Sequence, residues 1–334
     1  MKKLLAACLL LVTACTLPGG APPAPTGTPA PIPTALSAVP LQPTGQPGTE
    51  ANPLILALAP SAQPSTEIIQ NGQALAGRLQ TLSGLHIVLV APTTESELLR
   101  ALGSGNAQIA VLSPFAYLLA SSKGQATPML ARVRDGEALY GSQFIARSDM
   151  GFKVYFDTAR GENTAEATQA LFQFQDRKPC WSDSASPSGY VVPLGALKGS
   201  GFSTREPAFV GGQPTVVRAV YGKGICDFGA TYIDARRLPA LENDYPDVLE
   251  KVKVIWQIPP VIPYEVVAAA SSLNPEIKRS LLRAFIDIMN TSDGKLLIQT
   301  VYGIDAFQPA DESLYKAFND YVRASGLDLN ELIR

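Results

Sequence analysis

Histidine is almost missing from this chain of 334 residues, which contains only His86. One histidine excludes metal sites built from several imidazole ligands and every Ser-His-Asp triad that does not use it. Charged residues are also few, at 17%, and 27 Lys and Arg nearly balance 29 Asp and Glu. A nucleic-acid binder that works through a basic field needs an excess of cations. The composition therefore argues against nucleic acid as a partner.

Long apolar runs are scarce, and the one that suggests a membrane segment lies at the extreme N-terminus. Lys2 and Lys3 precede an apolar run from Leu4 to Val12. A bilayer span needs about 20 apolar residues, so this shorter run predicts a signal peptide. The run ends at Val12-Thr13-Ala14-Cys15, which resembles a bacterial lipobox. We expect residues 1–14 to be a lipoprotein signal peptide and Cys15 to be lipidated, and an ordinary cleaved signal is the alternative.

The next segment has the composition of a tether. Residues 16–50 contain ten prolines and a single charged residue, Glu50. Such a segment cannot bury an apolar face, so residues 15–51 are expected to form an extended tether after the lipidated cysteine. A tethered domain outside a membrane suits a protein that captures solutes, and it suits a secreted enzyme equally well.

Two cysteines remain after export, Cys180 and Cys226. In an oxidising compartment an even pair of cysteines predicts a disulfide. Two buried free thiols are the alternative.

Strand-like and helical patterns alternate from residue 53 onward. A continuous apolar run at 54–58 and strand-like runs at 86–90 and 108–112 are separated by helical patterns. This order is typical of a parallel sheet flanked by helices. The same order restarts near Cys180, and a helical part follows Asn274. We expect an α/β fold of two lobes, each a mainly parallel sheet flanked by helices, joined by two crossover strands. The expected lobes are residues 52–143 with 258–334, and residues 144–257.

The loop Asp183-Ser-Ala-Ser-Pro-Ser-Gly189 carries the clearest chemical signal. Ligands of open α/β sheets bind beyond the carboxyl ends of the strands, and this loop joins a strand to a helix. Ser186 suits the N-cap and Pro187 the first helical position. The free N–H groups, the helix dipole and the hydroxyls of Ser186 and Ser188 would then suit a tetrahedral oxyanion. A capped helix start with nothing bound is the alternative.

Other strand ends add neutral and aromatic donors. An acidic group such as Asp234 is costly beside an anion unless it pairs with a ligand cation or a protonated oxygen. Taken singly, each of these residues is more commonly a turn or core residue, and their shared position at strand ends is what favours a site. The candidate ligand contacts are Ser61, Thr94, Tyr117, Tyr140, Ser186, Pro187, Ser188, Gly189, Gln213 and Asp234.

Several segments, in order along the chain, resemble one known family. The most specific is DSASPSGYVVP at 183–193, where that family has an Asp-Pro-x-Ser-Thr-Ser-Gly-Tyr/Phe-x-x-Pro string. With this and weaker matches, the chain resembles the PhnD-like substrate-binding lipoproteins of phosphate, phosphite and phosphonate ABC importers, which have the type II periplasmic-binding fold. The weaker matches lie at 58–61, 93–102, 108–117, 209–212, 260–263 and 302–307.

The resemblance implies specific roles for several residues. It implies that Ser186, Pro187 and Ser188 hold a ligand between the lobes, with Pro187 replacing the threonine of the family. Tyr140 falls at an aromatic ligand contact, and Thr94 stands where the family commonly has a tyrosine. Near Gln213 the family commonly has a histidine or similar donor. Asp234 matches an acidic position that faces the ligand's ammonium group in aminophosphonate binders.

We therefore expect a monomeric solute-binding protein, lipid-anchored to the extracytoplasmic face of the cell membrane. It would capture a small phosphonate, phosphite or phosphate-like oxyanion and deliver it to an ABC permease, without a cofactor or a metal. The chain offers no plausible nucleophile–base pair, so we do not expect an enzyme. A sensing module for a signalling partner and an enzyme on the same fold are the alternatives.

Overall fold

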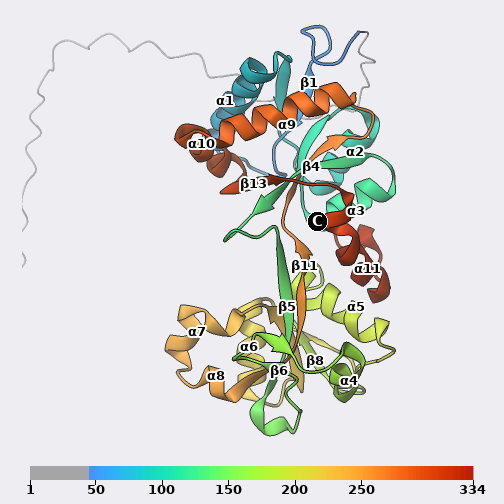
Figure 1. Cartoon of the computed structure of the whole chain (residues 1–334), viewed down its shortest axis with the longest axis vertical. Coiled ribbons are helices and arrows are strands. Elements are labelled where there is room, and N and C mark those ends of the chain that lie inside the picture. The colour runs from blue at the N-terminus through green and yellow to red at the C-terminus, as the bar shows by residue number, and fades with distance from the viewer. Residues whose placement is uncertain (1–44, 334) are drawn as a thin grey trace, which may run out of the picture. The chain divides into compact units, whose positions relative to one another are not determined.

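The computed structural model describes residues 45–333 (Figure 1). The predicted signal peptide and Cys15 lie outside the described residues, as does most of the predicted tether. None of the helices within residues 45–333 combines the length and the apolar character needed to cross a membrane. Two separate sheets organise these residues, and we call each sheet with its helices a lobe.

Lobe 1 is built on a six-stranded sheet in the order β13-β4-β12-β3-β1-β2. Alternate residues of its central strand enter opposite cores: Ile109 and Val111 pack on one face, and Ala110 and Leu112 on the other. Helices α1, α9 and α10 cover the first face, and α2 and α3 the second. The elements are β1 (Leu54–Ala57), α1 (Thr66–Ser83), β2 (Ile87–Val90), α2 (Glu95–Ser104), β3 (Ile109–Leu112), α3 (Pro114–Ser122), β4 (Ala126–Val133), β12 (Val266–Ala270), α9 (Pro275–Met289), α10 (Ser292–Tyr302) and β13 (Ala306–Pro309).

Lobe 2 is built on a five-stranded sheet in the order β11-β5-β10-β8-β9. Its two longest strands, β5 and β11, are antiparallel neighbours that pair from Val252 with Arg147 to Pro263 with Leu139, so both crossings between the lobes run side by side. The elements are β5 (Leu139–Arg147), β6 (Phe156–Asp157), β7 (Glu162–Asn163), α4 (Ala167–Leu171), β8 (Pro179–Trp181), α5 (Val192–Gly199), β9 (Ala208–Phe209), α6 (Gln213–Gly222), β10 (Phe228–Tyr232), α7 (Pro239–Asp244), α8 (Val248–Lys251) and β11 (Val252–Pro263).

Both sheets are mixed, which corrects the prediction of mainly parallel sheets. In lobe 1, β1 pairs in parallel with β2 and β3, whereas β12 is antiparallel to both of its neighbours. In lobe 2, β10 is parallel to β8 and antiparallel to β5. Apart from the edge strand β13, which is antiparallel to β4, the antiparallel pairs involve strands that carry the chain into or out of a lobe. An alternating βα pattern predicts the parallel core, but it does not reveal the direction of a strand that arrives from the other lobe.

Polar residues at the strand ends begin the helices of lobe 1. The hydroxyls of Ser65, Thr94 and Ser113 accept hydrogen bonds from the backbone N–H groups three residues later, and so cap α1, α2 and α3. The Oδ1 of Asn274 caps α9 by accepting from the N–H of Glu276, two residues later, and Pro275 holds the first helical position. These caps fix where the four helices begin.

The C-terminal helix α11 (Lys316–Ser325) follows lobe 1 in the chain but packs against α5 of lobe 2. Gly195 permits the close approach, because a Cβ atom there would collide with the backbone oxygen of Tyr321. The Nζ of Lys198 donates a hydrogen bond to the backbone oxygen of Ser325, at 2.7 Å. The predicted first lobe, residues 52–143 with 258–334, therefore includes a helix that packs on lobe 2.

The end of the predicted tether packs on the folded chain. Gly48 donates from its N–H to the backbone oxygen of Asn52 at 2.8 Å and accepts from the N–H of His86 at 2.7 Å. Gly48 has a φ of +89°, and a Cβ there would lie 2.6 Å from Leu85. Gly48, which falls within the predicted tether, therefore already contacts lobe 1, and composition alone does not reveal this contact.

Cys180 and Cys226 form a disulfide in lobe 2, with Cα atoms 5.6 Å apart. Cys180 lies in β8, and Cys226 comes two residues before β10, the parallel neighbour of β8. Both cysteines are buried among apolar residues of the same core. The bond therefore ties together two strands whose carboxyl ends face the cleft described below.

Replacement of both cysteines by alanine is expected to lower the free energy of unfolding of lobe 2 by about 4 kcal/mol. The reason is that the bond closes a loop between residues 46 positions apart and restricts the unfolded chain. Urea unfolding of the double variant and the unmodified protein measures the difference. Digestion without reductant should release one peptide pair linked through Cys180 and Cys226, and separate peptides with free thiols would contradict the bond.

Candidate functional site

Three polar side chains meet where β8 turns into α5. The turn is π-helical (η3, Pro187–Val191), and the Oγ of Ser186 caps it by accepting from the N–H of Gly189 at 3.0 Å. From the start of α6, the Nε2 of Gln213 donates to the Oγ of Ser186 at 3.1 Å and to the Oγ of Ser188 at 3.3 Å. We call Ser186, Ser188 and Gln213 the cradle.

The orientation of the Gln213 amide is fixed from its other end. Its Oε1 accepts a hydrogen bond from the backbone N–H of Tyr232 at 3.1 Å, at the end of β10. Because the oxygen is engaged there, the NH₂ group must face the two serines. Ser142 of β5 also holds the turn, because its Oγ donates a hydrogen bond to the backbone oxygen of Ser188 at 2.6 Å. Hydrogen bonds from β10 and from β5 therefore hold the cradle in place.

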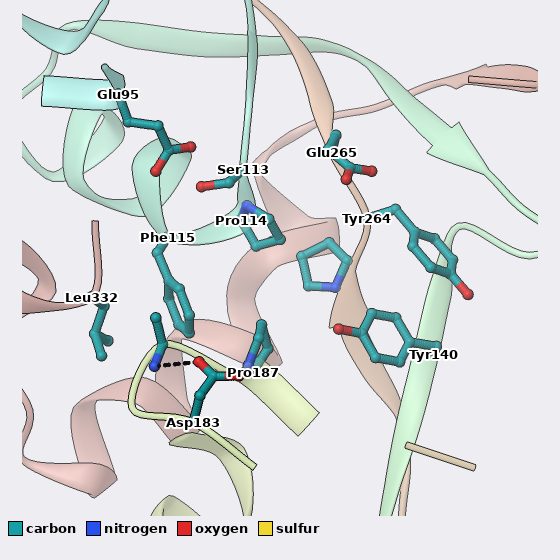
Figure 2. A pocket seen from close by; sticks show the side chains of 12 residues that line it. Glu95, Ser113, Pro114, Phe115, Tyr140, Asp183, Pro187, Tyr264, Glu265 and Leu332 are labelled. Carbon is teal, nitrogen blue, oxygen red and sulfur yellow. Dashed lines mark hydrogen bonds between the residues drawn. The ribbon is translucent and has the colours of Figure 1, made fainter. Parts of the chain in front are cut away.

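The cradle lines a cavity of about 490 Å³ that also has residues of lobe 1 in its wall. A second cavity of about 350 Å³ shares Tyr140, Pro187, Tyr264 and Glu265 with the first (Figure 2). We call the two cavities together the cleft. The remaining lining residues are Arg132, Arg134, Asp135, Ser186, Ser188, Gln213, Tyr232 and Ile233 in the first cavity, and Glu95, Ser113, Pro114, Phe115, Asp183, Ala185, Pro263 and Leu332 in the second.

Two tyrosines from the crossing strands form one wall of the cleft. Tyr140 of β5 stacks on Tyr264, just beyond β11, with ring centroids 4.9 Å apart. Burial raises the pKa of Tyr140, and a hydrogen bond with Ser188 opposes that rise. Burial also raises the pKa of Tyr264. Both phenols therefore stay neutral at physiological pH and can offer a hydroxyl to a ligand.

Charged side chains of the cleft come mainly from lobe 1. Two guanidinium groups, those of Arg132 and Arg134, and four carboxylates line it. Arg132 is paired with Glu265, with Nη1 and Oε2 3.0 Å apart. Three of the carboxylates surround the smaller cavity in Figure 2. The four carboxylates are Glu95, Asp135, Asp183 and Glu265.

This geometry can now be compared with known proteins. The family model for the periplasmic substrate-binding protein of phosphonate ABC transporters matches residues 57–315, which is most of the chain. The chain belongs to this family. The resemblance to PhnD-like proteins and the two-lobed α/β fold predicted from the sequence are confirmed.

Among relatives, the phosphate-import protein PhnD of Mycolicibacterium smegmatis is 26% identical over 246 residues, which are 69% of this chain and 70% of that protein. Two solved structures share the fold. XAC2383 from Xanthomonas citri bound to ATP has a TM-score of 0.56 at 15% identity, over 84% of this chain and 99% of that one. PhnD1 from Prochlorococcus marinus in complex with methylphosphonate has a TM-score of 0.50 at 13% identity, over 81% and 97%.

The structure of this family member brings half of the predicted contacts together. Tyr140, Ser186, Pro187, Ser188 and Gln213 all line the cleft. The turn after β8 and the start of α6, which follows β9, converge as the parallel-sheet argument requires. Tyr140 comes instead from the beginning of β5, which is antiparallel to β10. Their contact with a ligand stays a prediction.

Tyr117 does not line the cleft. It belongs to α3, is 1% exposed and packs against Tyr315 with ring centroids 4.2 Å apart. Burial raises the pKa of its hydroxyl. The prediction placed Tyr117 at a strand end, but the N-cap Ser113 and three residues of α3 separate it from the end of β3, and its ring packs in the core.

Asp234 is part of a buried ion pair and does not line the cleft. Its Oδ2 lies 2.6 Å from Nη2 of Arg236, and its Oδ1 accepts from Nε2 of Gln143 at 2.7 Å. Desolvation raises the pKa of this carboxyl, but the hydrogen bonds and the charge of Arg236 outweigh it, so the pKa is lowered. With its carboxylate committed to Arg236 and Gln143, Asp234 does not occupy the ammonium-facing position that the resemblance implied.

The three other candidates have local structural roles. Gly189 is buried, and a Cβ atom there would collide with the hydroxyl of Ser182, so this glycine shapes the turn without reaching the cavity. The hydroxyl of Thr94 caps α2, and the next residue, Glu95, is the one that lines the cleft. Ser61 is half-buried beyond β1, where its N–H bonds to the oxygen of Pro92.

Sequence analysis missed the charged and aromatic residues that lobe 1 and the crossing strands contribute. Arg132 lies within β4, and Tyr264 and Glu265 lie between β11 and β12, inside the second predicted crossover at 256–267. The segment Arg134-Asp135-Gly136-Glu137 suggests only a charged turn, although Arg134 and Asp135 line the cavity. A weak signal existed for Tyr264 and Glu265, because a crossover between lobes passes the mouth of the cleft.

Asp234→Asn is expected to lower the free energy of unfolding by about 3 kcal/mol at pH 7, because it leaves the buried guanidinium of Arg236 without a counter-charge. The measurement is urea unfolding. Asp244→Asn, which removes an exposed partner of Arg218, is the matched control and should cost less than about 1 kcal/mol.

The difference should also depend on pH. Because the folded-state pKa of Asp234 is lowered, its stabilisation is present above the unfolded pKa of about 4 and is lost as the pH falls through the folded value. The stabilities of the variant and the unmodified protein should therefore begin to converge as the pH falls below about 4, and should meet only below the lowered folded-state pKa. Equal stability at pH 7 would contradict the structural role.

Proposed function

We propose that this substrate-binding protein captures a small tetrahedral oxyanion, of the phosphonate or phosphate class, in the cleft between its lobes. The observation that carries the proposal is the cradle, where one glutamine amide gathers the hydroxyls of Ser186 and Ser188 at the start of a helix. Neutral donors at a helix N-terminus suit an oxyanion that must be released again. Family membership and the phosphate-import relative support the same class of ligand.

We propose that binding closes the lobes around the ligand. The cleft has walls from both lobes, and β5 with β11 connects them in two adjacent strands. A ligand that touches both walls binds the closed form better than the open form, and this difference drives closure. The lobes we assign are 52–143 with 258–334 and 144–257, with α11 bridging from the first to α5 of the second.

Substrate-binding proteins of ABC importers pass small ligands to a membrane permease, and this family is extracytoplasmic. For this chain we propose a monomer held to the outer face of the cell membrane by a lipid on Cys15. Support for the anchor comes from the lipobox-like residues and the proline-rich segment that follows them. Labelling of the expressed protein with a radioactive fatty acid, lost on Cys15→Ser, tests the anchor.

We propose binding without chemical change to the ligand. The residues that line the cleft, among those the structure describes, include no cysteine, histidine or lysine that could serve as nucleophile or base. Recovery of the ligand with unchanged mass after prolonged incubation supports binding alone, and a changed mass would favour an enzyme. Impaired ligand uptake after loss of the protein favours transport, whereas altered signalling with normal uptake favours a sensor.

Ser188→Ala and Gln213→Ala are each expected to weaken binding of methylphosphonate and inorganic phosphate at least tenfold. Ser188→Ala removes a donor to a charged ligand, worth about 1.5–3 kcal/mol, and 1.4 kcal/mol corresponds to a factor of ten. Gln213→Ala removes the amide that orients the hydroxyls of Ser186 and Ser188. Isothermal titration calorimetry measures the affinity.

Ser184→Ala is the matched control, since Ser184 is an exposed serine of the same loop that does not line the cleft. Its affinity should equal that of the unmodified protein. Thermal unfolding of the ligand-free Ser188→Ala variant should stay within a few degrees of the unmodified protein. Full affinity in Ser188→Ala and Gln213→Ala together would remove the cradle from the site.

A further inference from the structure

Arg132 stands in the wall of lobe 1 that borders the same cavity as the cradle of lobe 2. Its backbone N–H donates to the backbone oxygen of Glu265 at 2.9 Å, and its Nη1 donates to the Oε2 of the same residue at 3.0 Å. The side chain of Arg132 is 19% exposed. A backbone bond and a side-chain bond to one partner hold the guanidinium beside the cavity.

The ion pair leaves part of the guanidinium unused. Arginine has five N–H donors in a rigid fork, and Glu265 accepts from one nitrogen, Nη1. The Nε is enclosed and has no hydrogen-bond partner among the described residues. A buried donor without a partner is unfavourable, and a guanidinium fork matches the paired oxygens of a phosphate or phosphonate group.

The cradle itself carries no charge, so any counter-charge for an oxyanion comes from elsewhere in the cleft. Arg132 and Arg134 are the two cations that line it. Arg134 is 61% exposed and faces Asp135 at 3.9 Å, so water screens its charge. Arg132 is held in place and largely shielded from water, where a charge acts more strongly.

We propose that Arg132 is a ligand-binding residue that sets specificity, supplying the cation that pairs with the oxyanion when the lobes close. Glu265 positions the guanidinium and competes with the ligand for it. This inference rests on the proposed function, because it assumes that the cradle holds an oxyanion. It assigns to lobe 1 the charge recognition that the neutral donors of lobe 2 do not provide.

The test measures binding of methylphosphonate and inorganic phosphate to the full chain by calorimetry, at fixed pH and ionic strength. Arg132→Gln should weaken both at least 30-fold. Arg132→Lys should recover part of the loss, to within tenfold of the unmodified protein, because it restores the charge but not the fork. Arg134→Gln, the matched control from the same cavity, should change affinity less than threefold.

Glu265→Gln gives an independent arm that keeps Arg132 in place. Removal of the competing carboxylate should strengthen binding of both probes at least threefold, and this gain should vanish when Arg132→Gln is added. The affinity of Glu265→Gln also tests the role of Arg132 if Arg132→Gln fails to fold. Unchanged or weaker binding of both probes by Glu265→Gln would overturn the inference.

The outcomes separate the inference from the proposed function. Binding by Arg132→Gln within threefold of the unmodified protein, together with loss of binding in Ser188→Ala, overturns the role of Arg132 and leaves the cradle as the site. Failure of the unmodified protein to bind either probe contradicts the proposed function, and the inference falls with it.

Discussion

The amide of Gln213 is the interaction on which the site depends. It links three elements that are far apart in the sequence: the turn after β8, the start of α6 and the end of β10. The backbone N–H of Tyr232 fixes its orientation, so the serine hydroxyls face one donor in a defined geometry. The Cys180–Cys226 disulfide ties β8 to the segment before β10, and so reinforces the support of the cradle. A preorganised cradle needs little reordering when a ligand binds.

Burial gives two arginine–carboxylate pairs of the same chemistry different roles. In the pair of Asp234 and Arg236, both side chains are largely removed from water, and Gln143 and backbone groups saturate them. That pair can only stabilise lobe 2. In the pair of Arg132 and Glu265, the carboxylate is 41% exposed and the guanidinium keeps an unpaired donor beside a cavity. Unfilled hydrogen-bonding capacity at a cleft, and not the presence of charge, distinguishes a recognition group from a structural one.

Much of the architecture was predictable from local patterns. Apolar runs gave the parallel strands β1, β2 and β3, because strands buried on both faces leave a continuous hydrophobic signal. Asn274 and Pro275 marked the start of α9 through their capping chemistry. The loop at 183–189 pointed to the cradle, because a serine-rich helix start beyond a strand is a local feature. The directions of β5, β11 and β12 were not predictable, since they depend on how the chain passes between lobes.

The sequence by itself determined the α/β class, the family and the serine turn of the cleft. Each of these is recognised from short local segments and from their order along the chain. Only the tertiary structure decided which polar residues reach the cavity. It turned Tyr117 into the core, gave Asp234 to Arg236, and brought Arg132 and Glu265 opposite the cradle from 133 residues apart. The positions of these side chains depend on packing and on charge pairing between residues far apart in the sequence, and neither leaves a local sequence pattern.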